Sequence, residues 1–384
     1  MNSTISRPAV AAGTFALIVA LTFSGSAQAQ DYTLGANARN FAMGGAGLAL
    51  VRSSGSDGRA NPASLAYERN NVAPTFPSLG VRSEGPATSN AGSSYLYGGA
   101  KQADAISLAG VYGSAPSTAG INGYLAFRVG KLELSSNGVG LLHVRPNASW
   151  ANWVQHGNNE FNTLPADGQV DLFAAGYYTL PAVGYATTLR GNLISKNSTS
   201  ALGLRVKDIV GVYSHQIVNA GFDAGLNHTA IHSNLAPEMN NTRILRKSGI
   251  GADMGFLVRP KGLTGVSAGL VAENFIKPSI VFNSPGAGQR FSIIPSSLSA
   301  GLGFEARSGL TLAADLINIG GGKDLEGNGT QDMRVGMEQR FFKVVAVRGG
   351  YSKLSGATYG FGFFGFDVAL GKKVPLEVVR SLNF

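Results

Sequence analysis

From about Val72 to the carboxyl terminus, short segments recur in which apolar residues alternate with small or polar ones. Gly, Asn, Ser or Pro separate these segments. A period of two places successive side chains on opposite faces of a β-strand. In residues 123–129, for example, the apolar positions are Leu125, Phe127 and Val129. The clearest cases are residues 123–129, 299–305, 310–316 and 334–341. The pattern predicts an all-β fold with one apolar face on each strand.

Two fold classes have such strands. In a soluble sandwich the apolar faces of two sheets pack together, whereas in a transmembrane barrel the apolar face meets lipid and the other lines a polar interior. Glycine accounts for 53 of the 384 residues, and small residues at the non-apolar positions suit a crowded interior that another segment approaches closely. We therefore predict one antiparallel outer-membrane β-barrel of about 14 strands over residues 72–384, with twelve or sixteen strands and the sandwich as alternatives.

The first residues have the pattern of a secretory signal peptide. Arg7 precedes an apolar stretch over residues 9–19, and Ala27-Gln28-Ala29 forms a small-x-small cleavage pattern. We predict a signal peptide over residues 1–29. An uncleaved anchor is the alternative, although a span needs about 20 apolar residues. An exported chain without cysteine depends on burial and hydrogen bonds rather than on disulfides.

Between the signal and the first strand lies a stretch, Gly35 to Ala66, that does not alternate. We predict that residues 30–71 form a plug inside the barrel. Its glycines lack the GxGxxG spacing of a nucleotide-binding loop. Asn61-Pro62 predicts a turn or short helix in which Asn61 is the cap and Pro62 the first helical residue.

The segment ARNFAMGGAG (Ala38 to Gly47), followed by Asn61-Pro62-Ala63, resembles the amino-terminal region of the long-chain fatty-acid transporter (FadL) superfamily. Weaker matches at residues 253–260, 274–278 and 351–366 are most similar to its PorV/TraF-like branch. The resemblance implies that this region plugs the barrel, and that hydrophobic ligands leave sideways through an opening in the wall. It assigns plug or gate roles to Met43, Gly44, Gly45, Gly47, Asn61, Pro62 and Ala63.

Charges of both signs lie on the predicted polar faces of the later strands, where they could pair across the lumen. These lumen candidates are Glu305, Asp315, Arg334, Glu338, Arg340 and Arg348. The formal net charge is +9, but the basic residues are scattered singly rather than clustered as in a nucleic-acid groove. We predict no nucleic-acid partner.

Three patterns resemble metal or catalytic sites. Residues 324–332 alternate oxygen donors as a calcium loop does, but Val335 stands where a bidentate Glu is needed, so a polar turn explains them equally well. His228 and His232 are four residues apart without a third ligand. His143 and His215 lie in strand-like segments without an assignable nucleophile. We predict no enzyme activity, no cofactor and no metal.

Three further features concern the barrel itself. The apolar alternation slips by one residue at Phe363-Phe364, which predicts a β-bulge. The longest irregular stretches, Pro146 to Gly168 and Asn227 to Arg243, are predicted extracellular loops, with Trp150, Trp153 and Phe161 at the membrane interface or barrel mouth. The last segment alternates back from Phe384, which resembles the signal read by the barrel-assembly machinery.

These features predict uptake or passage of small hydrophobic molecules through the outer membrane, with membrane lipid and an apolar ligand as partners. The alternative is a PorV/TraF-like envelope barrel that docks a secreted protein and transports nothing.

Overall fold

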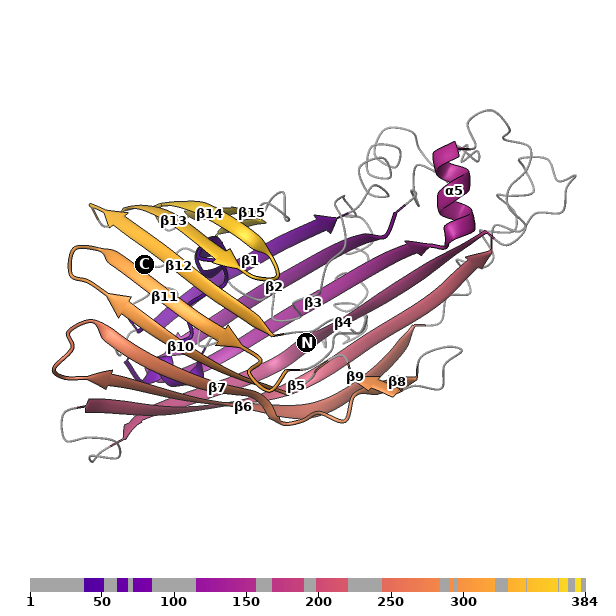
Figure 1. The fold of residues 1–384 in the computed structure, drawn as a ribbon. Coiled ribbons are helices and arrows are strands. Elements are labelled where there is room, and N and C mark those ends of the chain that lie inside the picture. Colours follow the sequence, from indigo (N-terminus) through magenta and orange to yellow (C-terminus); the bar gives the residue numbers. More distant parts are fainter. Residues whose placement is uncertain are drawn as a thin grey trace, which may run out of the picture.

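The computed structural model describes residues 38–51, 61–67, 72–84, 115–156, 168–189, 198–219, 244–283, 290–292, 294, 296–321, 331–342, 344–364, 366–371 and 377–380. The helices among them are α2 Ala38–Ala42, the 3-10 helix η1 Pro62–Tyr67 and α5 Ala148–His156 (Figure 1). None of these helices is long and apolar enough to cross a membrane. The strands are β1 Val72–Glu84, β2 Ser117–Val129, β3 Leu132–Pro146, β4 Gln169–Leu189, β5 Ser198–Asn219, β6 Leu245–Pro260, β7 Val266–Ile276, β8 Val281–Asn283, β9 Arg290–Ser292, β10 Ser297–Glu305, β11 Leu310–Ile317, β12 Asp332–Phe341, β13 Val345–Ser352, β14 Gly356–Phe363, β15 Phe366–Gly371 and β16 Glu377–Arg380.

Fourteen of these described strands form one closed antiparallel barrel, and β8 and β9 form a separate two-stranded sheet. Each barrel strand pairs with the next along the chain, except that β7 pairs with β10 because β8 and β9 leave the wall. Pairing of β1 with β16, with Ser78 opposite Val379, closes the barrel. A closed antiparallel barrel with an even number of strands is the outer-membrane type. The predicted fold class is therefore confirmed, including about fourteen strands.

The two ends of the barrel differ in their connections. At one end, which we call the short-turn end, residues 130–131 join β2 to β3 and residues 306–309 join β10 to β11. At the other, the long-connection end, residues 147–168 join β3 to β4 and residues 277–296 join β7 to β10. Periplasmic turns are short and extracellular loops are long in outer-membrane barrels. We therefore expect the long-connection end to face outward.

The wall is much taller on one side of the barrel. Strands β4 and β5 contain 21 and 22 residues, whereas β14 and β15 contain 8 and 6. At about 3.3 Å per residue β4 is ~70 Å long, although about 9–11 residues suffice to cross a bilayer. Strands β4 and β5 consequently extend well beyond the membrane, toward the end where α5 lies (Figure 1).

The predicted faces of the strands are confirmed. On β2, Leu125 and Phe127 are about half exposed, whereas Arg128, which follows Phe127, is buried. On β10, Leu302 is 61% exposed and Glu305 is 6% exposed. Outward apolar side chains next to buried charges on the same strands are the reverse of a soluble protein's surface. They are what a lipid-facing barrel requires.

The predicted β-bulge at Phe363-Phe364 is wrong. Strand β14 ends at Phe363, the chain turns at Phe364 with a φ of 46°, and β15 begins at Phe366. Phe363 is paired with Phe366 across this hairpin. Residues opposite each other in an antiparallel pair face the same side of the sheet, so both rings point outward. The slip in the alternation thus marks the end of one strand and the start of another.

Part of the predicted loop over Pro146 to Gly168 is helical. Asn147 precedes α5, and its side-chain oxygen accepts a hydrogen bond from the backbone N–H of Trp150 at 2.9 Å, as an N-cap does. Trp150 is buried. The predicted signal peptide over residues 1–29, the loop Asn227 to Arg243, Phe161 and Phe384 lie outside the described residues, as does the side chain of Trp153.

We predict that Leu302→Arg destabilises the barrel in lipid vesicles by about 2–4 kcal/mol, because it places a charge on the lipid-facing wall. Leu263→Arg is the matched control, since Leu263 is equally exposed but lies in the turn between β6 and β7. That change should cost about 0–1 kcal/mol. Denaturant unfolding in vesicles measures both. Equal costs for the two variants would show that this surface does not face lipid.

Candidate functional site

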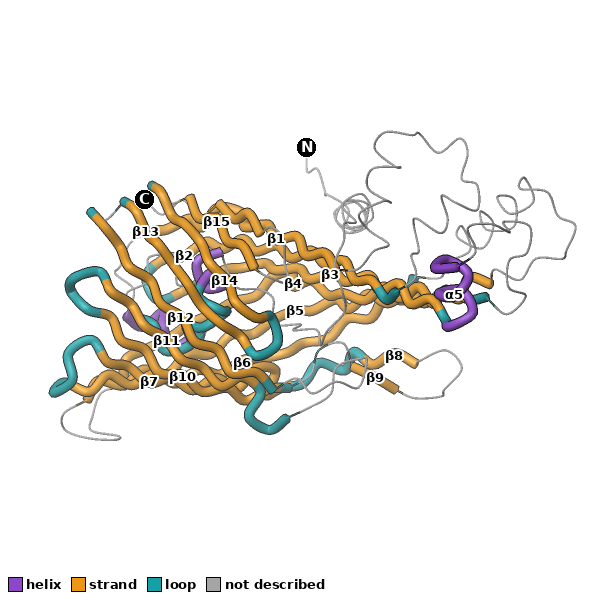
Figure 2. The backbone as a smooth tube through the Cα atoms, turned by 45° about the horizontal axis from the view of Figure 1, so that its top comes forward, coloured by secondary structure: helices purple, strands orange, loops and turns teal. Residues whose placement is uncertain are grey.

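Residues 38–51 and 61–67, which we call the inner segment, lie inside the barrel. Figure 2 shows α2 and η1 enclosed by the strands. Helix α2 packs against β13 to β16, and η1 packs against β4, β5 and β6 on the opposite side. The described part of the region predicted to be a plug therefore lies inside the barrel. The inner segment thus places one helix on each of two opposite sides of the wall.

Two wall carboxylates bind the backbone between the helices. Asp315 on β11 accepts hydrogen bonds from the backbone N–H groups of Gly47 and Leu48, at 2.6 and 3.0 Å. Glu305 on β10 accepts one from the N–H of Val51 at 2.9 Å. This part of the chain is not helical and satisfies only some of its own backbone groups, as where the N–H of Leu50 donates to the carbonyl of Gly47 at 3.2 Å. A buried N–H without an acceptor is costly, so the acids of the wall replace the missing backbone partners.

Wall hydroxyl groups bind the same stretch. Ser267 on β7 donates to the carbonyl of Ala49 at 2.6 Å. Thr358 on β14 donates to the carbonyl of Ala42 and accepts from the N–H of Gly44, at 3.2 and 2.9 Å. Together with the carboxylates, these side chains attach the inner segment to β14, β11, β10 and β7 in turn. The segment thus runs along the inner wall instead of standing free in the lumen.

Asn61 is the predicted cap of η1, and its interactions confirm this. Its side-chain oxygen accepts from the N–H of Ala63 at 2.9 Å, while Pro62 is the first residue of η1. Its amide nitrogen donates to the carbonyls of Leu48 and Phe256, at 3.0 and 3.2 Å. One side chain therefore caps the helix, ties it to the preceding stretch and attaches it to β6.

The inner segment touches the wall backbone to backbone at glycines. A Cβ added to Gly350 on β13 would lie 2.1 Å from the backbone nitrogen of Gly44 and from the carbonyl carbon of Met43. One added to Gly203 on β5 would lie 2.2 Å from the carbonyl carbon of Pro62. Both distances are impossible for a real side chain, so these wall positions admit only glycine while the segment stays in place.

A buried ionic cluster fixes α2. Arg39 binds Glu338 on β12 through two nitrogens, at 2.7 and 2.9 Å. Arg340 and Arg348 also bind Glu338, at 2.9 and 2.6 Å, and Arg348 continues to Asp367 on β15 at 2.6 Å. Bidentate pairing of an arginine with a carboxylate is strong and directional. Removing one partner from a buried pair typically costs roughly 3–5 kcal/mol, so the cluster sets the position of α2 firmly.

The charge of Arg39 is secure. Burial alone would lower the pKa of Arg39, but the negative charge of Glu338 and the hydrogen bonds to it outweigh burial and raise that pKa above its ordinary value. The guanidinium therefore stays charged inside the barrel. Nearby, Arg334 binds Asp332 at 2.7 Å and donates weakly to the carbonyl of Gly45 at 3.5 Å.

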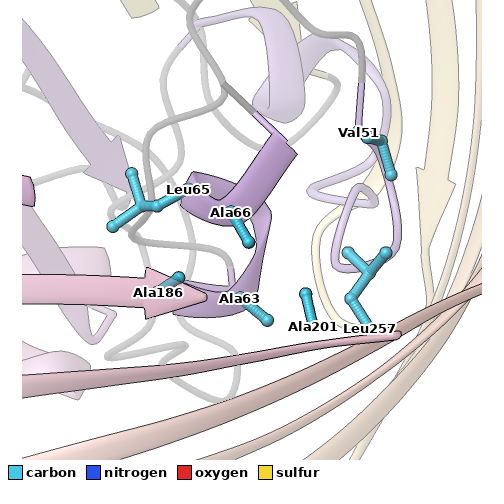
Figure 3. Close-up of a cluster of buried hydrophobic side chains, with 7 residues drawn as sticks. All are labelled: Val51, Ala63, Leu65, Ala66, Ala186, Ala201 and Leu257. Atoms are coloured by element: carbon cyan, nitrogen blue, oxygen red, sulfur yellow. The ribbon is translucent and has the colours of Figure 1, made fainter. Parts of the chain in front are cut away.

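Apolar contacts fix η1 (Figure 3). The cluster joins four residues of the inner segment to two alanines and a leucine of the wall, and consists of Val51, Ala63, Leu65, Ala66, Ala186, Ala201 and Leu257. Tyr67 packs at its edge and donates to the carbonyl of Thr199 at 3.2 Å. Burial raises the pKa of the Tyr67 hydroxyl. The two ends of the inner segment are thus held differently, since α2 combines its ionic cluster with apolar packing on Ala369 of β15, whereas η1 is held mainly by apolar packing.

A second ionic chain lines the wall near η1. Glu133 on β3 binds Arg128 and Arg205, at 3.0 and 3.4 Å. Arg205 and Lys207 on β5 bind Asp253 on β6, at 3.6 and 2.6 Å. These residues were not among the predicted lumen charges. The same period-two rule would have found Glu133 and Arg205, because each occupies a polar position between outward apolar ones.

The residues predicted as plug or lumen groups lie together. The seven plug residues all belong to the inner segment, and those other than Gly45 are buried. Five of the six lumen candidates are buried, and Arg340 is partly exposed. Glu338 pairs with Arg340 on its own strand and with Arg348, which lies opposite it on the neighbouring strand β13, so these pairs lie along the wall rather than across the lumen. Glu305 and Asp315 instead bind the backbone of the inner segment, which alternation alone could not indicate.

The other predicted motifs bring no site together. Residues 324–330, His228 and His232 lie outside the described residues. Asp332 is described, and its carboxylate accepts hydrogen bonds from Arg334, Ser352 and the N–H of Leu354. His215 binds Asp171 at 2.6 Å. Within the described part of the chain, no three His, Asp or Glu side chains are placed to hold a metal ion.

Comparison with known proteins gives only distant likenesses. No protein-family model matches the chain, and no curated protein matches it. Among solved structures, the chain is similar to the CymD monoaromatic hydrocarbon channel, with 12% identity over 91% of this chain and 96% of that one and a TM-score of 0.45. It is less similar to outer membrane phospholipase A from Escherichia coli, with 11% identity over 76% and 84% and a TM-score of 0.26. At these values neither likeness bears on the activity of this chain.

We predict that Gly350→Ala destabilises the protein by about 3 kcal/mol or displaces α2 and Gly44, because overpacking against backbone cannot be relieved by a rotamer change. Gly349→Ala is the matched control, since a Cβ at Gly349 has no atom within 4 Å. Denaturant unfolding and limited proteolysis near residue 44 measure the two effects. If both variants behave as wild type, the inner segment does not lie against β13.

Proposed function

We propose that this protein is an outer-membrane channel for small hydrophobic molecules, and that the inner segment closes it. The carrying observation is the attachment of the inner segment to the wall from β14 round to β4. A segment in that position obstructs the lumen, and its displacement would open a path. A ligand can shift such an equilibrium only by binding the displaced state more tightly than the closed one.

The way in which the inner segment is held supports a reversible closure. Between α2 and η1, Leu48 and Leu50 pack in small apolar clusters with the wall. The backbone N–H groups there donate hydrogen bonds to Asp315 and Glu305, and the Ala49 carbonyl accepts one from Ser267. Each such bond contributes about 0.5–1.5 kcal/mol net, rising to about 1.5–3 for those to charged groups. A folded barrel can lose a few of these hydrogen bonds at a time, whereas the ionic attachment of α2 is not easily broken. We infer that α2 stays fixed and that the stretch from Gly47 to η1 moves.

Irregular pairing in the wall near η1 supports a sideways exit, as the FadL resemblance implies. The register between β3 and β4 shifts between Ser135 and Gly138, and that between β4 and β5 shifts between Thr179 and Ala182. Pro181 in this stretch has no N–H to give to a neighbouring strand. Side chains bridge the break, since Ser136 donates to the carbonyl of Thr179 at 2.8 Å. Side-chain bridges separate more readily than a regular ladder.

Removing the acids that hold the inner segment should open the channel. We predict that the Asp315→Ala/Glu305→Ala double variant takes up a fluorescent hydrophobic probe, N-phenyl-1-naphthylamine, several-fold faster than wild type when made in cells. Deleting Gly35 to Ala66 should have at least the same effect. Asp171→Ala is the matched control, because this wall acid binds His215 rather than the inner segment. The amount of folded barrel in the membrane is measured alongside.

Two results would contradict the proposal. If neither the double variant nor the deletion changes probe uptake or channel conductance while folded barrel is present, the inner segment does not gate passage. If wild-type protein moreover carries no bound apolar molecule after purification but retains a secreted protein, the non-transporting PorV/TraF-like scaffold becomes the better explanation.

A further inference from the structure

The connection between β7 and β10 folds back onto the inner face of the tall wall. Ile280, Phe282 and Ile294 from this connection form one buried cluster with Ala175, Ile209 and Tyr213 of β4 and β5. Strands β8 and β9 within it pair with each other and are not hydrogen-bonded into the barrel sheet. The connection is therefore held against the wall largely by its apolar side chains.

The ring of Phe282 fits between an aromatic side chain and a cation. Its centroid lies 5.4 Å from that of Tyr213 and 5.6 Å from the ammonium of Lys247 on β6. Phe282 is 1% exposed, whereas Lys247 is exposed. Lys247 also donates a hydrogen bond to the carbonyl of Val281. The ring thus lies at the boundary between packed interior and solvent.

Further aromatic side chains continue from this ring across the wall. The ring of Tyr213 lies 5.6 Å from that of Phe173 on β4, and Phe173 lies 5.3 Å from His143 on β3. The wall therefore supplies a row of aromatic faces and one exposed cation, while the connection supplies the ring that covers their end. Aromatic rings attract one another in such tilted arrangements, and a cation is attracted to the face of a ring.

We propose that the place filled by Phe282 is a binding site for an uncharged molecule bearing one aromatic ring, which enters by displacing Phe282. This inference rests on the proposed channel function and names the class of molecule that it takes. The binding groups, Tyr213 and Lys247, belong to the rigid wall. The displaceable ring belongs to a connection outside the barrel ladder. A saturated molecule of the same size has no π-system and would lose the contacts that both wall groups offer.

The position of the Phe282 site suits the capture of an entering molecule rather than closure of the channel. Tyr213 and Gly203 are both on the inner face of β5, and Gly203 is one of the residues that contact η1. Ten residues along a strand correspond to about 33 Å, so the site is far from the inner segment. It lies toward the long-connection end, which we expect to face outward. A molecule would meet the Phe282 site first and the inner segment afterwards.

The test measures binding to purified, detergent-solubilised protein by ¹⁹F NMR titration with fluorobenzene and fluorocyclohexane. Phe282→Ala should bind fluorobenzene at least tenfold more tightly than wild type and should prefer it to fluorocyclohexane. Adding Lys247→Met should remove most of that preference. Val281→Ala, on the same short strand, is the matched control and should behave as wild type. Should Phe282→Ala fail to fold, Phe282→Leu replaces it, with an expected gain of at least threefold.

Equal binding of the two probes by the Phe282 variants would overturn the inference, because the space would then be merely apolar. So would a Phe282 variant that binds fluorobenzene no better than wild type does. These results leave the proposed function testable by itself. Faster probe uptake after loss of Asp315 and Glu305, without aromatic preference at Phe282, overturns only this inference. Aromatic binding without any uptake overturns the proposed channel.

Discussion

The structure depends on hydrogen bonds that the wall supplies to an irregular buried backbone. A strand in a closed barrel satisfies its backbone through its neighbours, but a segment inside the lumen cannot do so. Asp315, Glu305, Ser267 and Thr358 take over that role for the inner segment. Burying a carboxylate is expensive unless it is hydrogen-bonded or paired. Each acid and each N–H group therefore compensates the other, and neither would be stable in the lumen alone.

This requirement also explains why the wall is rich in glycine and alanine. A backbone can form short hydrogen bonds with the wall only if it lies directly against it, and side chains at Gly350 or Gly203 would keep it away. Apolar side chains of the segment also pack on the wall between the helices, since Leu48 clusters with Val271 and Ile317. The two helices anchor the ends of the segment. Arg39 does so through charge and Leu65 through apolar contact. Close contact and end anchoring together place the segment in a single position.

Much of the fold was predictable because a barrel repeats one simple rule. The period-two alternation assigned Leu125, Leu302 and Glu305 to the correct faces, and Asn61-Pro62 indicated a capped helix start through local chemistry alone. Alternation cannot distinguish a bulge from a tight hairpin, since both shift the phase by one residue, and Phe364 was misassigned for that reason. It also cannot tell which partner a buried acid binds. Asp315 and Glu338 both occupy inward positions on their strands. Asp315 binds backbone, however, whereas Glu338 binds three arginines.

Amide hydrogen exchange of the purified barrel tests most directly whether the wall satisfies the inner segment. The account predicts that the amides of Gly47, Leu48 and Val51 exchange as slowly as those in the middle of β10 and β11. It predicts further that Asp315→Asn accelerates exchange at Gly47 and Leu48 more than at Val51, whose acceptor is Glu305. Exchange of all three at the rate of an unstructured peptide in the wild-type protein would contradict it.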